Sequence, residues 1–131
     1  MLVLQPFCTL AAFQEPIEAI GTRCGVPDLF TQIRCGVANG RAFLMTDDDS
    51  FCVLRPRIEK GDKVIEVWAA SGKGGNAIRA HFPQAQQMAL AVGAKYLQFW
   101  TVLPALNRLA RRLGFEPHRT EGDFTIWRMP L

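Results

Sequence analysis

The chain has 131 residues, a length that fits one domain built around one hydrophobic core. Its composition, 49% hydrophobic and 21% charged, excludes a protein that is disordered throughout. The net charge of +3 is too small to indicate nucleic-acid binding by itself, and a phosphate-bearing ligand would suit it equally well. No window reads as a membrane span or an export signal, so we expect a cytoplasmic protein.

Metal and disulfide chemistry are not expected from the acidic and thiol side chains. The three aspartates of Asp47-Asp48-Asp49 read as a hairpin tip, where adjacent side chains point in different directions. No CxxC pair is present, so a zinc site is poorly supported and no metal ligands are assigned. Apolar or small neighbours predict buried, reduced thiols at the four cysteines, which are Cys8, Cys24, Cys35 and Cys52.

The first half of the chain reads as a strand, two helices and a meander. Met1–Leu4 is a short apolar strand, and apolar residues recur at helical spacing over Leu10–Thr22, where Pro16 predicts a kink or an interruption. A second helix begins at Pro27 and closes at Asn39-Gly40. Three antiparallel strands with tight turns follow, at Arg41–Thr46, Phe51–Arg57 and Lys63–Ala69.

The second half alternates helices and strands. A helix over Asn76–Val92 carries an apolar stripe, although Pro83 inside it removes one hydrogen bond and usually bends the axis. The remaining elements are a strand at Tyr96–Val102, a helix from Pro104 to Gly114, and a closing hairpin of Phe115–Thr120 and Phe124–Met129. The order of elements predicts a single α/β domain over residues 1–131.

A glycine-rich turn separates the third meander strand from the long helix. Glycine permits positive φ and close approach of a ligand to the backbone, while the first N–H groups of a helix attract anions. Lys73 adds a cation, and neither a Walker ending nor GxGxxG is present. The pattern predicts a phosphate-binding turn made of Gly72, Lys73, Gly74, Gly75, Asn76 and Ala77.

This turn resembles the CoA-binding loop of the GNAT acyl-CoA N-acyltransferases, which has the form Arg/Gln-x-x-Gly-x-Gly/Ala. Gly75 and Ala77 match its second and third anchors, whereas Gly72 replaces the first. The resemblance extends to the order of elements and to Leu113-Gly114-Phe115 downstream. It implies a GNAT-like fold, with a central mixed twisted sheet of about six to seven strands flanked by about four helices.

The resemblance also implies an activity: transfer of an acyl group from acetyl-CoA, or a related acyl-CoA, to an unidentified amine. The acyl-CoA would lie beside Val67 and the glycine-rich turn, and Glu66 stands where the family often places a general base. The alternative for Glu66 is a cross-strand ion pair on a solvated face. The tyrosine and asparagine common in the family are replaced by Ala110 and Leu103, which counts against efficient transfer.

Several other polar residues have a structural interpretation beside a functional one. His81 could reach the mouth of the cleft but is favoured as solvent-facing, and His118 reads as a surface residue. Tyr96 is favoured as an anchor at the edge of the core. Two roles stay open for the arginines near the end of the Pro104 helix, which are Arg108, Arg111 and Arg112. They could contact the CoA 3′-phosphate, or they could form a solvated face near the helix C-terminus, where cations are favoured.

Two further classes of function stay open. The missing tyrosine and asparagine equivalents favour a non-catalytic GNAT-fold protein that acts as a structural or assembly module. A likeness to GNAT-like proteins of tailed phages makes a virion component part of that alternative. A nucleic-acid binder has only the arginine cluster and the mild positive charge behind it, and a homodimer is expected from family analogy alone.

Overall fold

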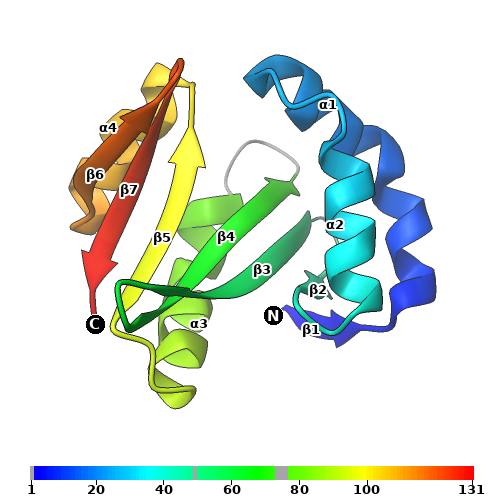
Figure 1. Cartoon of the computed structure of the whole chain (residues 1–131), viewed down its shortest axis with the longest axis horizontal. Helices are drawn as coiled ribbons and strands as arrows, with labels where there is room; N and C mark the ends of the chain where they lie inside the picture. The colour runs from blue at the N-terminus through cyan, green and yellow to red at the C-terminus, as the bar shows by residue number, and fades with distance from the viewer. Residues whose placement is uncertain (1, 49, 73–76) are drawn as a thin grey trace.

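The computed structural model describes residues 2–48, 50–72 and 77–131, which form one seven-stranded sheet with helices on both faces (Figure 1). The strand order is β1-β2-β3-β4-β5-β7-β6, and only the β4–β5 pair is parallel. This confirms the predicted mixed α/β sheet. The elements are β1 (Val3–Gln5), the 3-10 helix η1 (Phe7–Phe13), α1 (Gln14–Cys24), α2 (Leu29–Ala38), β2 (Phe43–Thr46), β3 (Ser50–Glu59), β4 (Asp62–Gly72), α3 (Ala77–Ala91), β5 (Tyr96–Thr101), α4 (Pro104–Leu113), β6 (Glu116–Glu121) and β7 (Phe124–Pro130).

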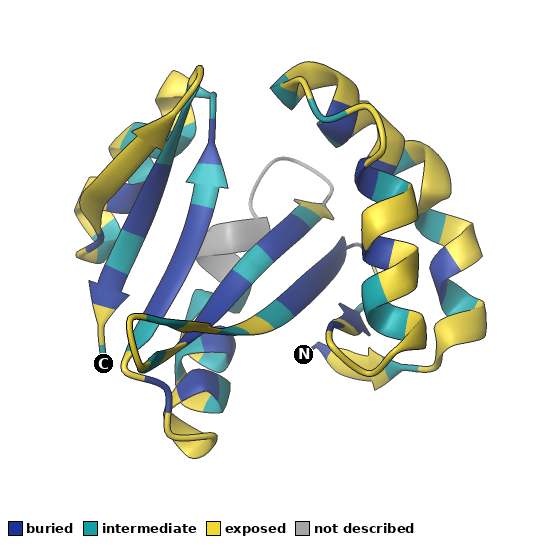
Figure 2. Cartoon of the chain, viewed as in Figure 1, coloured by how far each residue is buried: buried dark blue, intermediate teal, exposed yellow. Residues whose placement is uncertain are grey.

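Two hydrophobic cores lie on opposite faces of the sheet. Figure 2 shows that buried residues follow the central strands and the inward sides of the helices. The α1–α2 core takes its buried side chains from the first two helices and from β2, β3 and β4, among them Ile17, Ile33, Phe51 and Trp68. The α3 core lies under α3 and α4 and includes Ala85, Leu97, Phe99 and Trp127. Alternation along each strand sends successive side chains to different cores.

The first helical segment is interrupted, as Pro16 predicts. Residues Phe7–Phe13 form the 3-10 helix, and α1 begins at Gln14, so Pro16 lies in the first turn of α1, where its missing N–H breaks no helical hydrogen bond. Gly25, with φ of 75°, ends α1 in the left-handed conformation. The chain can therefore turn sharply and pack α2 beside α1.

The sheet opens between β4 and β5. Parallel pairing runs from Val64 opposite Tyr96 to Val67 opposite Phe99 and then stops, although β4 continues to Gly72 and β5 to Thr101. At the same level β3 pairs Val53 with Ala69 and Leu54 with Val67, which leaves Trp68 as a bulge on β4. Figure 1 shows the two strands diverging beyond this point. We call this opening the split.

The prediction that all four thiols are buried is wrong for Cys8 and Cys35. All four cysteines are free, and only Cys52 is buried, whereas Cys24 is half-buried. Cys35 lies two residues after the buried Ile33, and two residues along a helix turn the side chain to the opposite face. Small apolar neighbours in the sequence therefore did not report burial.

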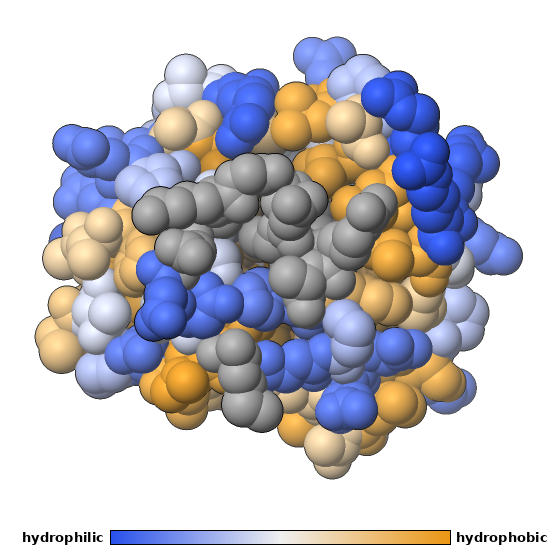
Figure 3. All heavy atoms as spheres, turned by 180° about the vertical axis from the view of Figure 1, so that it is seen from behind, coloured by the Kyte–Doolittle hydropathy of each residue, from blue (hydrophilic) through white to orange (hydrophobic). Residues whose placement is uncertain are grey.

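The surface mixes exposed hydrophobic residues with hydrophilic ones, as Figure 3 shows for the face opposite to that of Figure 1. The large exposed apolar side chains include Val3, Leu4, Phe7 and Phe43, from β1, η1 and β2. None of the helices in the described ranges is both long and apolar enough to cross a membrane.

Candidate functional site

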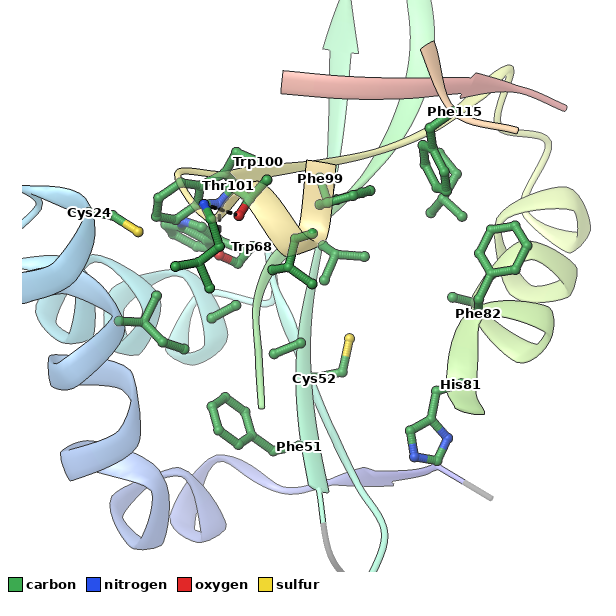
Figure 4. Close-up of a pocket in the computed structure, with 18 of the residues that line it drawn as sticks. Cys24, Phe51, Cys52, Trp68, His81, Phe82, Phe99, Trp100, Thr101 and Phe115 are labelled. Carbon is green, nitrogen blue, oxygen red and sulfur yellow. Dashed lines mark hydrogen bonds between the residues drawn. The ribbon is translucent and has the colours of Figure 1, made fainter. Parts of the chain in front are cut away.

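A cavity of about 120 Å³ occupies the split and is lined by residues from both faces of the sheet. Figure 4 shows Cys24, Trp68 and Trp100 toward α1, whereas Phe82 and Phe115 lie toward α3. The first group includes members of the α1–α2 core, and the second group packs in the α3 core. A ligand in this cavity would therefore contact side chains of both cores.

The split also exposes backbone groups. Past Val67, one row of β4 N–H and C=O groups has no strand partner on the β5 side. The indole Nε1–H of Trp100 donates to the carbonyl oxygen of Trp68 at 2.9 Å, which bridges the split once. The remaining groups of β4 could pair with an extended ligand that carries amides, as an added strand would.

His81 lines the cavity and contacts Asp47 in the β2–β3 turn and Ser50 at the start of β3. Its Nε2 lies 2.8 Å from Asp47 Oδ2 and 2.9 Å from Ser50 Oγ, while the Ser50 hydroxyl donates to Asp47 Oδ1 at 2.7 Å. Since a carboxylate only accepts, His81 Nε2 carries a hydrogen and donates. The prediction of a solvent-facing His81 is wrong, because only 16% of the side chain is exposed. This contact ties α3 to the β2–β3 turn.

Glu66 lies under an arginine and forms the cross-strand ion pair considered as its alternative role. The Arg55 guanidinium bonds Glu66 Oε2, with Nε at 2.9 Å, and Gln98 Nε2 donates to Oε1 at 3.3 Å. The pair is not on a solvated face, since Glu66 is 3% exposed. Glu66 is absent from the described lining of the cavity, and both its oxygens are engaged. Its role as a general base stays a prediction.

The predicted phosphate-binding turn falls largely outside the described residues, which omit Lys73, Gly74, Gly75 and Asn76. Gly72 is the last residue of β4 and Ala77 is the first residue of α3, so the turn connects the end of β4 that lies beyond its pairing with β5 to α3. Val67, the other predicted CoA contact, lines the cavity at the last paired position of β4.

The replacements for the tyrosine and asparagine of the family have different surroundings. Ala110 is fully buried in the α3 core and offers no proton, whereas Leu103 lines the cavity. Thr101 supplies a hydroxyl to the lining, and its Oγ1 accepts from the N–H of Leu103 at 3.0 Å. The Thr101 O–H proton stays available to donate.

The arginines of α4 do not line the cavity in the part of the chain that the structure describes. Arg108, Arg111 and Arg112 are exposed, and the Arg111 guanidinium lies 5.1 Å from the centre of the Trp127 ring. Asn107 Oδ1 accepts from the Trp127 indole at 2.8 Å. This side of α4 therefore helps to anchor the helix against β7.

Tyr96 and His118 lie away from the cavity. The Arg128 guanidinium covers the Tyr96 ring at 4.6 Å. His118 is exposed on β6, as predicted, and partial desolvation, followed by the charges of Arg128 and Arg119, lowers its pKa. Within residues 2–48, 50–72 and 77–131, no group of three or more His, Cys, Asp or Glu side chains could hold a metal ion.

Comparison with known proteins places the fold. No family model and no curated protein matches the sequence. A GNAT family acetyltransferase from Listeria monocytogenes matches with a TM-score of 0.73 at 10% identity, over 100% of this chain and 94% of that chain. The polyamine N-acetyltransferase of Drosophila melanogaster gives 0.69 at 10% identity over 100% of both chains.

A third similar structure contains the ligand that the sequence suggests. It is the PaiA N-acetyltransferase from Thermoplasma acidophilum in complex with coenzyme A, with a TM-score of 0.67 at 8% identity, over 100% of this chain and 99% of that chain. Identities this low establish the architecture and leave activity open. The chain has the GNAT fold, with the order of strands and helices that the resemblance of its glycine-rich turn implies.

Proposed function

We propose that the chain is an acyltransferase that binds acetyl-CoA, or a related acyl-CoA, in the split and transfers the acyl group to an amine. The observation that carries this proposal is the apolar cavity that passes between β4 and β5 beside an unpaired strand edge. The amides of the CoA arm would pair with β4 beyond Val67, and the pyrophosphate would lie against residues 72–77. The Thermoplasma protein with coenzyme A supports this choice of ligand.

The reaction would be direct attack of the amine nitrogen on the thioester carbonyl carbon. A C–N bond forms, the carbonyl oxygen gains negative charge, and backbone N–H groups of β4 beyond Val67 are placed to stabilise it. The C–S bond then breaks, the thiolate leaves, and the nitrogen loses its extra proton to water. The mostly apolar walls strengthen these electrostatic contacts by lowering the local dielectric constant.

The absence of a tyrosine acid slows this scheme without preventing it. A thiol has a pKa of about 8.5, so a thiolate can leave without being fully protonated in the transition state. The Thr101 hydroxyl can donate a hydrogen bond to the leaving sulfur. We therefore expect weak turnover compared with an enzyme that has a positioned acid, for which proton transfer is worth about 10²–10⁴-fold.

Isothermal titration with acetyl-CoA, and separately with free CoA, tests the proposal. We expect micromolar binding by the parent chain and loss of binding in Ala70→Trp, because an indole at this lining position would fill the cavity. Ala91→Trp, at the exposed end of α3, is the matched control and should bind like the parent. No binding by the parent up to millimolar concentration would refute the proposal and favour the assembly module.

A further inference from the structure

The charge of the cavity lining is one-sided. Among the lining residues that the structure describes, none is Asp or Glu, and Arg23 is the one with a permanent charge. Arg23 lies in the last turn of α1, is exposed, and forms no ion pair with any described residue. Among its described lining residues, the cavity thus has a free guanidinium at its α1 side and no carboxylate.

The cavity takes lining residues from both faces of the sheet, and the exposed Arg23 lies on the α1 face. Residues 72–77 connect β4 to α3, so an acyl donor held there would approach from the α3 side. The attacking amine must then come from the α1 side. The walls on that side are apolar and aromatic, and they include Ile20, Phe51, Trp68 and Trp100.

Asp47 and Glu66 carry carboxylates that lie beside lining residues, and both have partners: Asp47 contacts His81, and Glu66 precedes the lining residue Val67. Glu66 already accepts from Arg55, and the Arg55 guanidinium lies 3.9 Å from the centre of the Trp68 ring. The Arg55 guanidinium is paired with Glu66 and is not among the described lining residues, so Arg23 is the unpaired guanidinium of the described lining. An acceptor with a second ammonium group would be repelled there, whereas an acceptor with an anionic group would be attracted.

We propose that the acceptor is an amine with an apolar body and a carboxylate, and that Arg23 binds this carboxylate. The inference rests on the proposed acyl transfer for the direction of entry, and on the charges of the cavity itself for the chemistry. A guanidinium fork matches the two oxygens of a carboxylate. Arg23 is thus a specificity residue of the acceptor side.

The test compares ligands that differ only at the carboxylate. Binding of phenylalanine and leucine is compared with binding of their carboxamides, and spermidine serves as the polycation, by NMR of the labelled 131-residue chain without acyl-CoA. We expect each acid to bind at least about fivefold more tightly than its amide, as one charge-assisted hydrogen-bonding contact at a partly open mouth provides. Arg23→Gln should reduce this ratio to about one.

The control is Arg34→Gln, which removes an exposed arginine of α2 that does not line the cavity, and it should keep the ratio. Equal binding of acid and amide, tighter binding of spermidine, a ratio that survives Arg23→Gln, or no binding of either acid would each overturn the inference. Titration of the same variants with acetyl-CoA separates the two proposals. A carboxylate preference without acetyl-CoA binding would keep the Arg23 site and remove the transferase.

Discussion

Arg55 and Glu66 face each other across β3 and β4, and their pairing gives a buried carboxylate a cationic partner. The two residues are direct cross-strand partners, and the Arg55 side chain is 27% exposed whereas Glu66 is almost fully covered. The Arg55 guanidinium carbon lies 3.9 Å from the centre of the Trp68 ring, so the guanidinium both pairs with Glu66 and covers the indole. Arg55 therefore contributes both an ion pair with Glu66 and packing against Trp68.

Removal of the Arg55 side chain should destabilise the fold more than removal of the Arg57 side chain. Arg55→Met leaves Glu66 buried without its main cation, and we expect a loss of about 2 kcal/mol or more in the free energy of unfolding. Arg57 approaches Glu66 only at 3.6 Å and its side chain is 37% exposed, so Arg57→Met should cost less than about 1 kcal/mol. Urea unfolding of both variants measures the difference. Equal losses would mean that Gln98 alone is sufficient for Glu66.

Cys52 makes the stability depend on alkaline pH. Burial raises the pKa of its thiol from 9.0 to about 12, so the folded chain keeps a proton that the unfolded chain releases above about pH 9. The contribution is complete below the unfolded pKa and is lost as pH rises toward the folded one. Between about pH 8 and pH 10.5, the parent should therefore lose unfolding free energy more steeply than Cys52→Ala. Parallel slopes in urea unfolding would contradict this.

The interaction of His81 with Asp47 and Ser50 marks the limit of what the sequence predicts at this scale. Residue types and helical spacing place His81 one turn into α3, but its partners come from a turn more than thirty positions earlier. The local periodicity of a sequence does not indicate which residues make contact across more than thirty positions of the chain. The aspartate-rich turn is the available signal, and from the sequence alone it predicts only a hairpin tip.

At the scale of elements, the sequence predicts most of the order and little of the geometry. Proline and glycine signals place the breaks near Pro16, Gly25 and Gly114, because backbone sterics alone decide them. The split is not predictable in this way. It depends on the place where pairing of β4 with β5 stops, at Val67 and Phe99, and on the bulge at Trp68, which are properties of the assembled sheet.

The junction of α1 with α2 gives a prediction at the element scale. A Cβ added at Gly21 would lie 2.4 Å from the Val26 carbonyl oxygen and 3.0 Å from the Leu29 Cβ. The Val26 backbone cannot move away as a flexible side chain can, so Gly21→Ala should lower the free energy of unfolding by about 2 kcal/mol or more. Thr22→Ala, at the next and exposed position, should change stability by less than about 0.5 kcal/mol. Thermal unfolding of the pair decides whether this close approach limits the fold.

On the scale of the whole molecule, one sheet holds two cores and the cavity interrupts the sheet between them. On the α3 face Leu97 and Phe99 pack with Phe115, and on the other face Phe51 packs with Phe13 and Trp68. Beyond Val67 in β4 and Phe99 in β5, each strand pairs on one side only. We call these segments the free arms: that of β4 pairs with β3, and that of β5 pairs with β7. The free arms should consequently be the least stable part of the central sheet.

Hydrogen exchange measures the difference in local stability between the free arm of β4 and its paired part, and the same experiment tests where the ligand binds. Without ligand, amides of residues 68–72 should exchange faster than those of residues 64–67, which have strand partners on both sides. Acetyl-CoA bound along β4 would supply the missing partner, so exchange should slow selectively in residues 68–72 and stay unchanged in the β6–β7 hairpin. Slowing confined to that hairpin, or none in residues 68–72 when acetyl-CoA is bound, would place the ligand away from the split. Slowing at the free arm would instead identify the unpaired edge of β4 as the surface on which the acyl donor lies.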